Sequence, residues 1–267
     1  MAELASTSRS RHLAGLRALE SAKGASPRIR DPYAADLATH SLQPTTGAHL
    51  EAGDLSAADA QIEAISWVDQ QLAYIVDTVD TLRNEEVNQV VLLGDGLDTR
   101  PFRLRLPSGL VFYIVASAEA HSIAVAALAK REAATPRGSL VRRVKVHADV
   151  DLERALPTAG YRADRPSVWV LEGGVLESGE QLAALALQAA ELMSRGSRML
   201  GTLPPWSSDR GVEDLLASIG LLTDSLPGTA GVFAATQLHL SALQQDTYER
   251  HSLAAEETDE DFFGNFS

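Results

Sequence analysis

Short runs of hydrophobic residues that end at glycine recur along the chain. The clearest is residues 90–93 (VVLL), which stop at Gly94 and are too few to form a helix by themselves. A continuous apolar run of this length, bounded by a turn residue, is typical of a strand buried on both faces of a parallel sheet. Similar patterns predict strands at residues 110–117, 144–150, 167–172, 198–203 and 232–240. We take residues 90–93 as the strand around which the others are arranged.

Between these runs, hydrophobic residues recur at three- and four-residue steps, which indicates helices. This spacing is sustained from residue 59 to residue 83 and predicts one long helix that leads into the strand at 90–93. Asp31 followed by Pro32 is typical of a helix start, with a capping carboxylate and then proline at the first helical position. The other predicted helices cover residues 4–23, 118–134, 151–161, 179–194 and 212–220. Strands that alternate with helices predict an α/β fold with a mostly parallel sheet and helices on both faces.

The chain divides into three segments by composition. Residues 1–58 contain the first helices and a polar loop from residue 39, and we expect them to form a helical cap. Residues 59–243 carry the alternating strands and helices of a Rossmann-like domain. Residues 244–267 are acidic and then aromatic, which predicts a solvated tail or a segment that contacts a pocket, a second copy of the chain or another protein.

The balance of charges excludes several classes of partner. The 267 residues contain 36 acidic and 23 basic side chains, a formal net charge of −13. A face that binds nucleic acid or an anionic membrane needs an excess of positive charge, so we expect a small-molecule substrate instead. The absence of cysteine excludes disulfides and a cysteine nucleophile. No apolar run approaches the ~20 residues of a membrane span, and no stretch resembles a signal peptide, so a cytoplasmic location is expected.

Gly94, Asp95 and Gly96 form the turn that follows the strand at 90–93. Two residues without a Cβ atom allow the backbone to pass close to a ligand. In open α/β sheets, ligands bind outside the carboxyl ends of the strands, which is where this turn is expected. A G-x-G pattern alone is a weak signal, and ordinary turn chemistry accounts for it equally well.

The longer string GDGLDTRPFRL at residues 94–104 resembles the first motif of the leucine carboxyl methyltransferase family, which reads roughly LLGAGLDTRAYRL. Three further segments also resemble the family: ALES…RIRDPYAADLA near the N-terminus, HADVDL at residues 147–152 and RPSVWVLEG at residues 165–173. The resemblance covers roughly residues 14–203. It implies a Rossmann-like class I methyltransferase fold that binds S-adenosylmethionine. It also implies methyl transfer to a carboxyl or hydroxyl group of a small metabolite, secondary metabolites included.

The resemblance further implies which residues surround the cofactor. They are Gly94, Gly96, Asp98, Arg100, Asp149, Asp151 and Glu172. The two glycines would let the methionine portion lie against the backbone, and Arg100 would brace the loop. Asp149 or Asp151 would meet the adenine. Methyl transfer itself needs little beyond alignment of the acceptor oxygen with the sulfonium, so no general base is required.

Several positions differ from the family pattern. Asp95 stands where the family has alanine, and its carboxylate would meet the carboxylate of the cofactor as a like charge unless it turns away or is protonated. Val115 takes the place of the acid that would bind the ribose hydroxyls, and Tyr113 that of a glutamate. Glu177 takes the place of a tyrosine, and residues 64–69 (AISWVD) lack the arginines that would hold the cofactor's carboxylate. S-adenosylmethionine is therefore the implied cofactor, with a changed set of contacts.

These changes leave two alternatives to methyl transfer. In the first, the fold acts as a cofactor-independent cyclase or isomerase, with Asp95, Glu177 or His121 as acid or base. In the second, the chain is a non-catalytic partner that contacts another protein through its C-terminal tail. His121 also has the simpler interpretation of a surface histidine. No pair of histidines with a nearby acid has metal-ligand spacing, and no metal site is predicted.

Overall fold

The structure, a computed structural model, describes residues 7–38, 52–77, 87–146, 151–173, 176, 178–203, 209–223 and 231–239. Asp149, Glu177 and the tail at 244–267 lie outside the described residues. So does the first part, 39–51, of the predicted polar loop.

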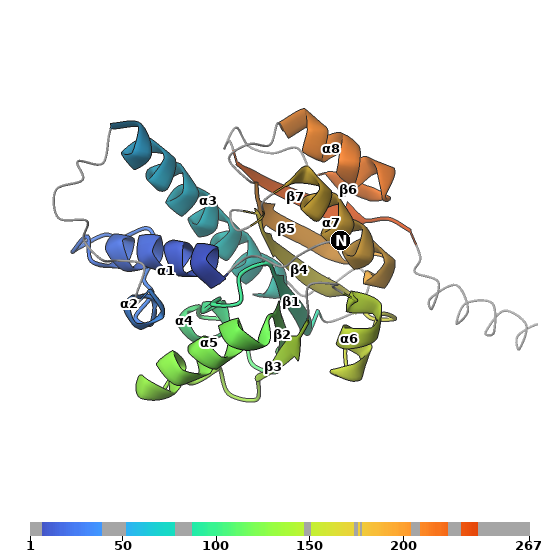
Figure 1. The fold of residues 1–267 in the computed structure, drawn as a ribbon. Helices are drawn as coiled ribbons and strands as arrows, with labels where there is room; N and C mark the ends of the chain where they lie inside the picture. Colours follow the sequence, from blue (N-terminus) through green and yellow to red (C-terminus); the bar gives the residue numbers. More distant parts are fainter. Residues whose placement is uncertain are drawn as a thin grey trace, which may run out of the picture.

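Within the described residues, seven strands form one sheet in the order β3-β2-β1-β4-β5-β7-β6 (Figure 1). The strands are β1 Gln89–Leu93, β2 Val111–Ala116, β3 Leu140–Lys145, β4 Ser167–Glu172, β5 Arg198–Thr202, β6 Leu221–Thr223 and β7 Val232–Gln237. The first five are parallel, and β7 runs antiparallel to both β5 and β6. Their order is that of a doubly wound Rossmann sheet. The predicted α/β class with a mostly parallel sheet is therefore confirmed.

Helices cover both faces of the sheet (Figure 1). They are α1 Thr7–Ser21, α2 Ala34–Leu37, α3 Ala52–Asp77, α4 Arg100–Arg103, α5 Ala118–Lys130, α6 Leu152–Thr158, α7 Gly179–Leu192 and α8 Asp209–Ser218. Leu72 of α3 and Leu92 of β1 belong to one hydrophobic core, whereas Leu185 of α7 and Leu93 of β1 belong to another. Because successive side chains of a strand point to opposite faces, the two cores lie on opposite sides of the sheet. None of the helices in the described part of the chain is long and apolar enough to cross a membrane.

Strand β1 occupies the place that its sequence predicts. All five of its residues are buried, and Leu93 at its end lies opposite Val115 of β2 and Leu171 of β4. The order of the strands reverses between β1 and β4, which makes this the switch point of the sheet. Open α/β sheets bind ligands in the crevice beyond the carboxyl ends of the strands at such a point. The turn at residues 94–96 leaves β1 at this crevice.

Two predicted elements have different bounds in the structure. The third strand is Leu140–Lys145 rather than 144–150, and it lies at one edge of the sheet. Its sequence, LVRRVK, carries three bases, which disfavour pairing with the edge of another sheet. The same bases interrupt the apolar run by which a buried strand is recognised. The long helix α3 begins at Ala52, so the domain boundary expected at residue 59 falls inside a helix. Helix α4 and strand β6, with four and three residues, are too short to show a period.

The first two helices also differ from their predictions. Helix α2 begins at Ala34, because the Asp31 carboxylate accepts the N–H of Tyr33 at 3.0 Å and forms a turn ahead of the helix. In α1, Arg17 lies on the buried face, whereas Leu19 is 55% exposed. The buried face of this helix is therefore partly polar.

Gly96 brings the turn after β1 into direct contact with its neighbours. A Cβ atom at this position would lie 2.6 Å from the Cβ of Ala116 and 2.7 Å from the Cβ of Ala120. Carbon atoms at this separation repel strongly, since their optimal distance is about 3.5–4 Å. Only glycine therefore lets the turn pack against the end of β2 and the start of α5, whatever ligand the site binds.

We expect Gly96→Ala to lower the free energy of unfolding by about 1–3 kcal/mol, because an extra methyl group in a filled contact has that effect. Urea unfolding followed by circular dichroism measures the loss. The matched variant is Gly96→Ala with Ala120→Gly, which removes one of the two opposing methyl groups. Its loss should be smaller than the sum of the two single losses. Strictly additive losses would contradict the close contact.

Candidate functional site

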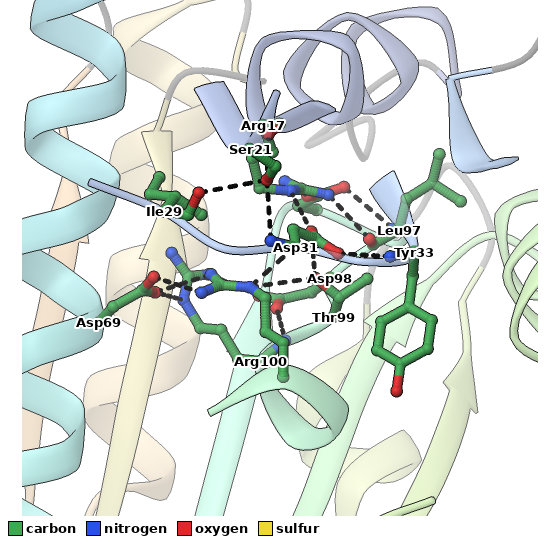
Figure 2. A network of polar contacts seen from close by, with 12 residues as sticks. Arg17, Ser21, Ile29, Asp31, Tyr33, Asp69, Leu97, Asp98, Thr99 and Arg100 are labelled. Atoms are coloured by element: carbon green, nitrogen blue, oxygen red, sulfur yellow. Dashed lines mark hydrogen bonds and ion pairs between the residues drawn. The ribbon is translucent and has the colours of Figure 1, made fainter. Parts of the chain in front are cut away.

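Helix α1 lies across the carboxyl edge of the sheet. At its start, Thr7 Oγ1 donates to Glu119 Oε2 in α5 at 2.8 Å. Arg9 Nη1 donates to the carbonyl of Leu176, beyond β4, at 2.7 Å. The helix thus spans the switch point from the β2 side to the β4 side. Further along, Arg17 extends from α1 toward the turn after β1 (Figure 2).

The guanidinium of Arg17 is buried at this turn, with only 3% of the residue exposed. Its Nε donates to Asp31 Oδ2 at 3.1 Å, its Nη1 to Asp95 Oδ2 at 2.9 Å and its Nη2 to the carbonyl of Leu97 at 3.0 Å. Asp95 Oδ1 accepts the N–H of Leu97 at 2.9 Å, which closes the turn. The sequence allows the Asp95 carboxylate to face the cofactor, to turn away or to be protonated. In the structure it turns away and pairs with Arg17.

Asp31 joins this pair to the segment after β1. Its Oδ2 accepts from Arg17 and also from Thr99 Oγ1, the latter at 2.6 Å. Figure 2 shows Asp31 between Arg17 and Thr99. Thr99 Oγ1 in turn accepts a hydrogen bond from Arg103 Nε at 3.1 Å. The loop ahead of α2 is therefore part of the site.

Arg100 binds three carboxylates from three parts of the chain. Its Nη1 donates to Asp98 Oδ2 at 2.5 Å, its Nε to Asp69 Oδ1 of α3 at 2.8 Å and its Nη2 to Glu172 Oε2 of β4 at 3.2 Å. Its backbone N–H donates to Asp98 Oδ1 at 2.8 Å. The residue is 2% exposed. Arg100 thus bridges β1 and β4 across the switch point and anchors α3 to both.

Acids outnumber bases in this network. Arg103 completes it by donating to both carboxylate oxygens of Asp69, at 2.5 and 2.9 Å. The buried acids are Asp31, Asp69, Asp95, Asp98 and Glu172, and the arginines with buried side chains are Arg17, Arg100 and Arg103. Five acids against three bases leave a formal excess of two negative charges when all are ionised.

The close pairing shifts pKa values in both directions. Burial opposes the charge on Arg17 and on Arg100, but the surrounding carboxylates raise the pKa of each guanidinium above its usual value. Burial would also raise the pKa of Asp69, yet Arg103 and Arg100 lower it below the usual value. These three side chains are therefore charged at neutral pH.

Glu172 behaves differently. Burial raises its pKa, against the opposing effects of Arg100 and of the hydrogen bond that Thr202 Oγ1 donates. The negative charges of Asp95 and Asp98 raise it further. A proton on Glu172 would remove one of the two excess negative charges.

Strand β2, all of it described, carries no acid where the resemblance implies a ribose contact. Val115 is fully buried in the core beneath α6 and α7. Tyr113 is buried as well, and its hydroxyl donates to the carbonyl of Gly160 at 2.9 Å. The first acid after the strand is Glu119, which accepts the hydrogen bond from α1.

His121 lies inside the molecule, with 3% of the residue exposed, so its interpretation as a surface histidine is wrong. Its Nε2 lies 3.0 Å from the carbonyl of Val144 and therefore carries the proton. Its Nδ1 accepts from Arg143 Nη1 at 3.4 Å. Burial lowers its pKa, and the charges of Arg143 and Lys145 lower it further. His121 is thus a neutral side chain that ties α5 to β3.

The predicted site residues separate into two groups. Asp95, Asp98, Arg100 and Glu172 join one network at the switch point. Gly94, at the same turn, has φ +103°, a left-handed conformation that glycine adopts without strain. Asp151 lies apart: it caps α6 by accepting the N–H of Arg154 at 3.0 Å. It borders a groove of about 750 Å³ between β3 and α6.

Sequence reasoning missed four charged side chains of the network: Arg17, Asp31, Asp69 and Arg103. The sequence predicts Asp31 only as a helix cap, and residues 64–69 are informative only for the absence of a base. One signal was available, because Arg17 follows Leu13 by one helical turn and so shares its buried face. A charge at such a position needs a buried partner.

The sequence model of one family, described as Leucine carboxyl methyltransferase, matches residues 12–176 of this chain. The chain belongs to this family. The matched stretch contains all the network residues named above except Thr202. The resemblance seen in the sequence is therefore confirmed.

Relatives in the family carry methyltransferase names. The rice protein "O-methyltransferase 1, chloroplastic" is 28% identical over 273 residues, covering 91% of this chain and 75% of its own length. A candidate S-adenosyl-L-methionine-dependent methyltransferase of Frankia alni is 32% identical over 201 residues, covering 72% of this chain and 66% of its own length. A protein of the same description from Mycobacterium avium is 28% identical, with 76% and 60% covered. This chain thus spans between 60% and 75% of the length of these relatives.

Solved structures are more distant. An O-methyltransferase family protein from Burkholderia thailandensis has a TM-score of 0.44 and 14% identity, covering 70% of this chain and 61% of its own. Magnesium protoporphyrin IX methyltransferase from Synechocystis with bound SAM has a TM-score of 0.42 and 13% identity, with 66% and 83% covered. Similarity at this level gives no information on the fold beyond what the sheet topology already shows.

In this leucine carboxyl methyltransferase family member, we expect Arg100→Ala to destabilise the fold by roughly 3–5 kcal/mol, because it leaves buried carboxylates without their base. Urea unfolding at pH 7 measures the change. Arg162→Ala is the control, because Arg162 pairs with Asp164 at the surface and its backbone contact to Gln89 survives the change. The control should leave the unfolding midpoint almost unchanged. Equal effects of the two variants would contradict the role given to Arg100.

We expect Glu172→Gln to stabilise the protein more at pH 7 than at pH 4. The pKa of Glu172 is raised in the folded state, so the folded protein binds this proton more tightly and loses stability as pH rises above the usual value near 4.5. Glutamine removes that dependence while keeping hydrogen-bonding groups for Arg100 and Thr202. Unfolding midpoints between pH 4 and pH 7 measure it. Asp164→Asn should act in the opposite direction, because Arg162 lowers the pKa of Asp164.

Proposed function

We propose that this protein is a cytoplasmic S-adenosylmethionine-dependent O-methyltransferase that acts on a carboxyl or hydroxyl group of a small metabolite. The observation that carries the proposal is the glycine turn at the switch point of a 3-2-1-4-5 sheet, in a chain of the leucine carboxyl methyltransferase family. Gly94 has a positive φ of 103° and leaves the carboxyl end of β1, where such sheets bind ligands. The methyltransferase names of the relatives support the same reaction.

The described side chains fit the cofactor only in part. The glycine turn is in place, but the nearest base, Arg17, already donates from all three nitrogens to protein acceptors. Val115, in the place of the ribose acid, is fully buried in the core. The contacts implied for the cofactor's carboxylate and for its ribose are therefore not formed by the residues that the resemblance points to.

This mismatch favours a second candidate, a protein of the same fold that does not transfer methyl groups. The described acid–base candidates, Asp95 and His121, both use their side-chain atoms in internal contacts. That arrangement supports a ligand-binding or partner role over a cyclase or isomerase role.

Methyl transfer from labelled S-adenosylmethionine to a panel of small acids and phenols tests the first candidate. A carboxyl acceptor gives a methyl ester that releases methanol in base, whereas a hydroxyl acceptor gives a stable ether. We expect one of these products. Absence of product, together with absence of S-adenosylmethionine and S-adenosylhomocysteine binding at millimolar ligand, would leave the second candidate.

Two glycine variants localise the binding site. Gly94→Ala and Gly109→Ala both force alanine into a positive φ, 103° and 85° respectively, but Gly109 precedes β2 at the opposite edge of the sheet. We expect Gly94→Ala to weaken S-adenosylhomocysteine binding by about tenfold or more and Gly109→Ala to leave it within about twofold. Calorimetric titration measures both. Equal weakening would place the ligand elsewhere.

A further inference from the structure

Arg17 and Asp95 form a buried ion pair at the turn after β1, where open α/β sheets bind ligands. Asp95 belongs to the turn itself, is 2% exposed and lies 2.9 Å from the Arg17 guanidinium. An arginine paired with a carboxylate at such a place is also how a protein binds the carboxylate of a small molecule. Here, the carboxylate is part of the chain.

Arg17 does not need Asp95 for neutrality. Asp31 already pairs with the same guanidinium at 3.1 Å and is itself buried. Asp95 is a second carboxylate on one base, in a network that holds two more acids than arginines. A neutral residue in its place would leave Arg17 paired and would bring the network closer to charge balance.

While Asp95 is present, every nitrogen of the Arg17 guanidinium already donates to a protein acceptor. Its three nitrogens donate to Asp31, Asp95 and the carbonyl of Leu97. A ligand carboxylate at this turn would have to displace Asp95 or lie beside it. Two like charges in contact away from water repel strongly, whereas a positively charged amine would be attracted.

We propose that Asp95 is a specificity-determining residue that occupies Arg17 as a built-in carboxylate, so that the site disfavours adenosyl ligands carrying a free carboxylate and prefers those carrying an amine alone. This inference rests on the proposed binding of an adenosyl ligand at the turn after β1. It assigns to Asp95 a role in ligand choice instead of proton transfer.

Three ligands separate charge from shape. S-adenosylhomocysteine carries an amine and a carboxylate, S-adenosyl-3-thiopropylamine lacks only the carboxylate, and 5′-deoxy-5′-methylthioadenosine lacks both. The wild-type chain should bind the amine more tightly than S-adenosylhomocysteine. In Asp95→Ala, the affinity for S-adenosylhomocysteine should rise by about tenfold or more, and the order of these two ligands should reverse. Binding of the neutral thioether should change by less than about twofold.

Two further variants complete the experiment, with calorimetric titration as the readout. Asp95→Asn removes the charge but keeps one acceptor oxygen for the N–H of Leu97, so it preserves the turn and reports on charge even where Asp95→Ala unfolds. Like Asp95→Ala, it should raise the affinity for S-adenosylhomocysteine relative to that for S-adenosyl-3-thiopropylamine. Asp164→Asn changes the net charge equally at a surface pair and should leave the affinity for each of the three ligands unchanged.

The outcomes distinguish this inference from the proposed function. Binding of the neutral thioether by all folded variants, without a gain for S-adenosylhomocysteine on removal of Asp95, overturns the inference and leaves the adenosyl site standing. An equal gain for all three ligands also overturns it, because that would mean a larger pocket instead of a freed base. Failure of every variant to bind any adenosyl ligand overturns both proposals.

Discussion

The buried guanidinium of Arg100 determines the geometry of the whole carboxyl edge. It contacts the long helix α3, the segment after β1 and the end of β4. A planar guanidinium presents its donors in set directions, so three carboxylates bound to it cannot move independently. The position of α3 relative to the segment after β1 and the end of β4 follows from this constraint.

The N-terminal segment is part of the same construction. Arg17 and Asp31, both ahead of α3, join the network through Asp95 and Thr99. Buried ion pairs contribute little net stability against a well-packed apolar alternative, but loss of one partner is strongly destabilising. A network of this kind therefore selects one arrangement of α1, α3 and the sheet more than it adds to total stability. Residues 1–58, which the sequence predicts to form a helical cap, thus supply two side chains of the network.

The sequence predicts the sheet well because its central strands are apolar and end at glycine. Strands β1 and β4 lie within a residue of their predictions, whereas β3 was misplaced because an edge strand with three bases lacks an apolar pattern. The glycine turn and the family were also recognisable. The pairing of charges could not be predicted, because Arg17 and Asp95 are 78 residues apart in the sequence and Arg100 and Glu172 are 72 apart. Local propensity contains no information on such contacts. For the same reason the burial of His121 against β3 could not be predicted.

The contacts of α1 have a consequence for synthesis on the ribosome. This helix is synthesised before the sheet, and the carbonyl that Arg9 binds belongs to residue 176, which is made 167 residues later. At about 5–20 residues per second, roughly 10–30 seconds pass before that partner exists. During this interval, the polar face of α1 lies in water, and its serine and charged side chains keep it soluble. The polar residues that α1 buries in the folded protein, such as Ser10, Arg17 and Glu20, thus also limit its exposed apolar surface before the strands are made.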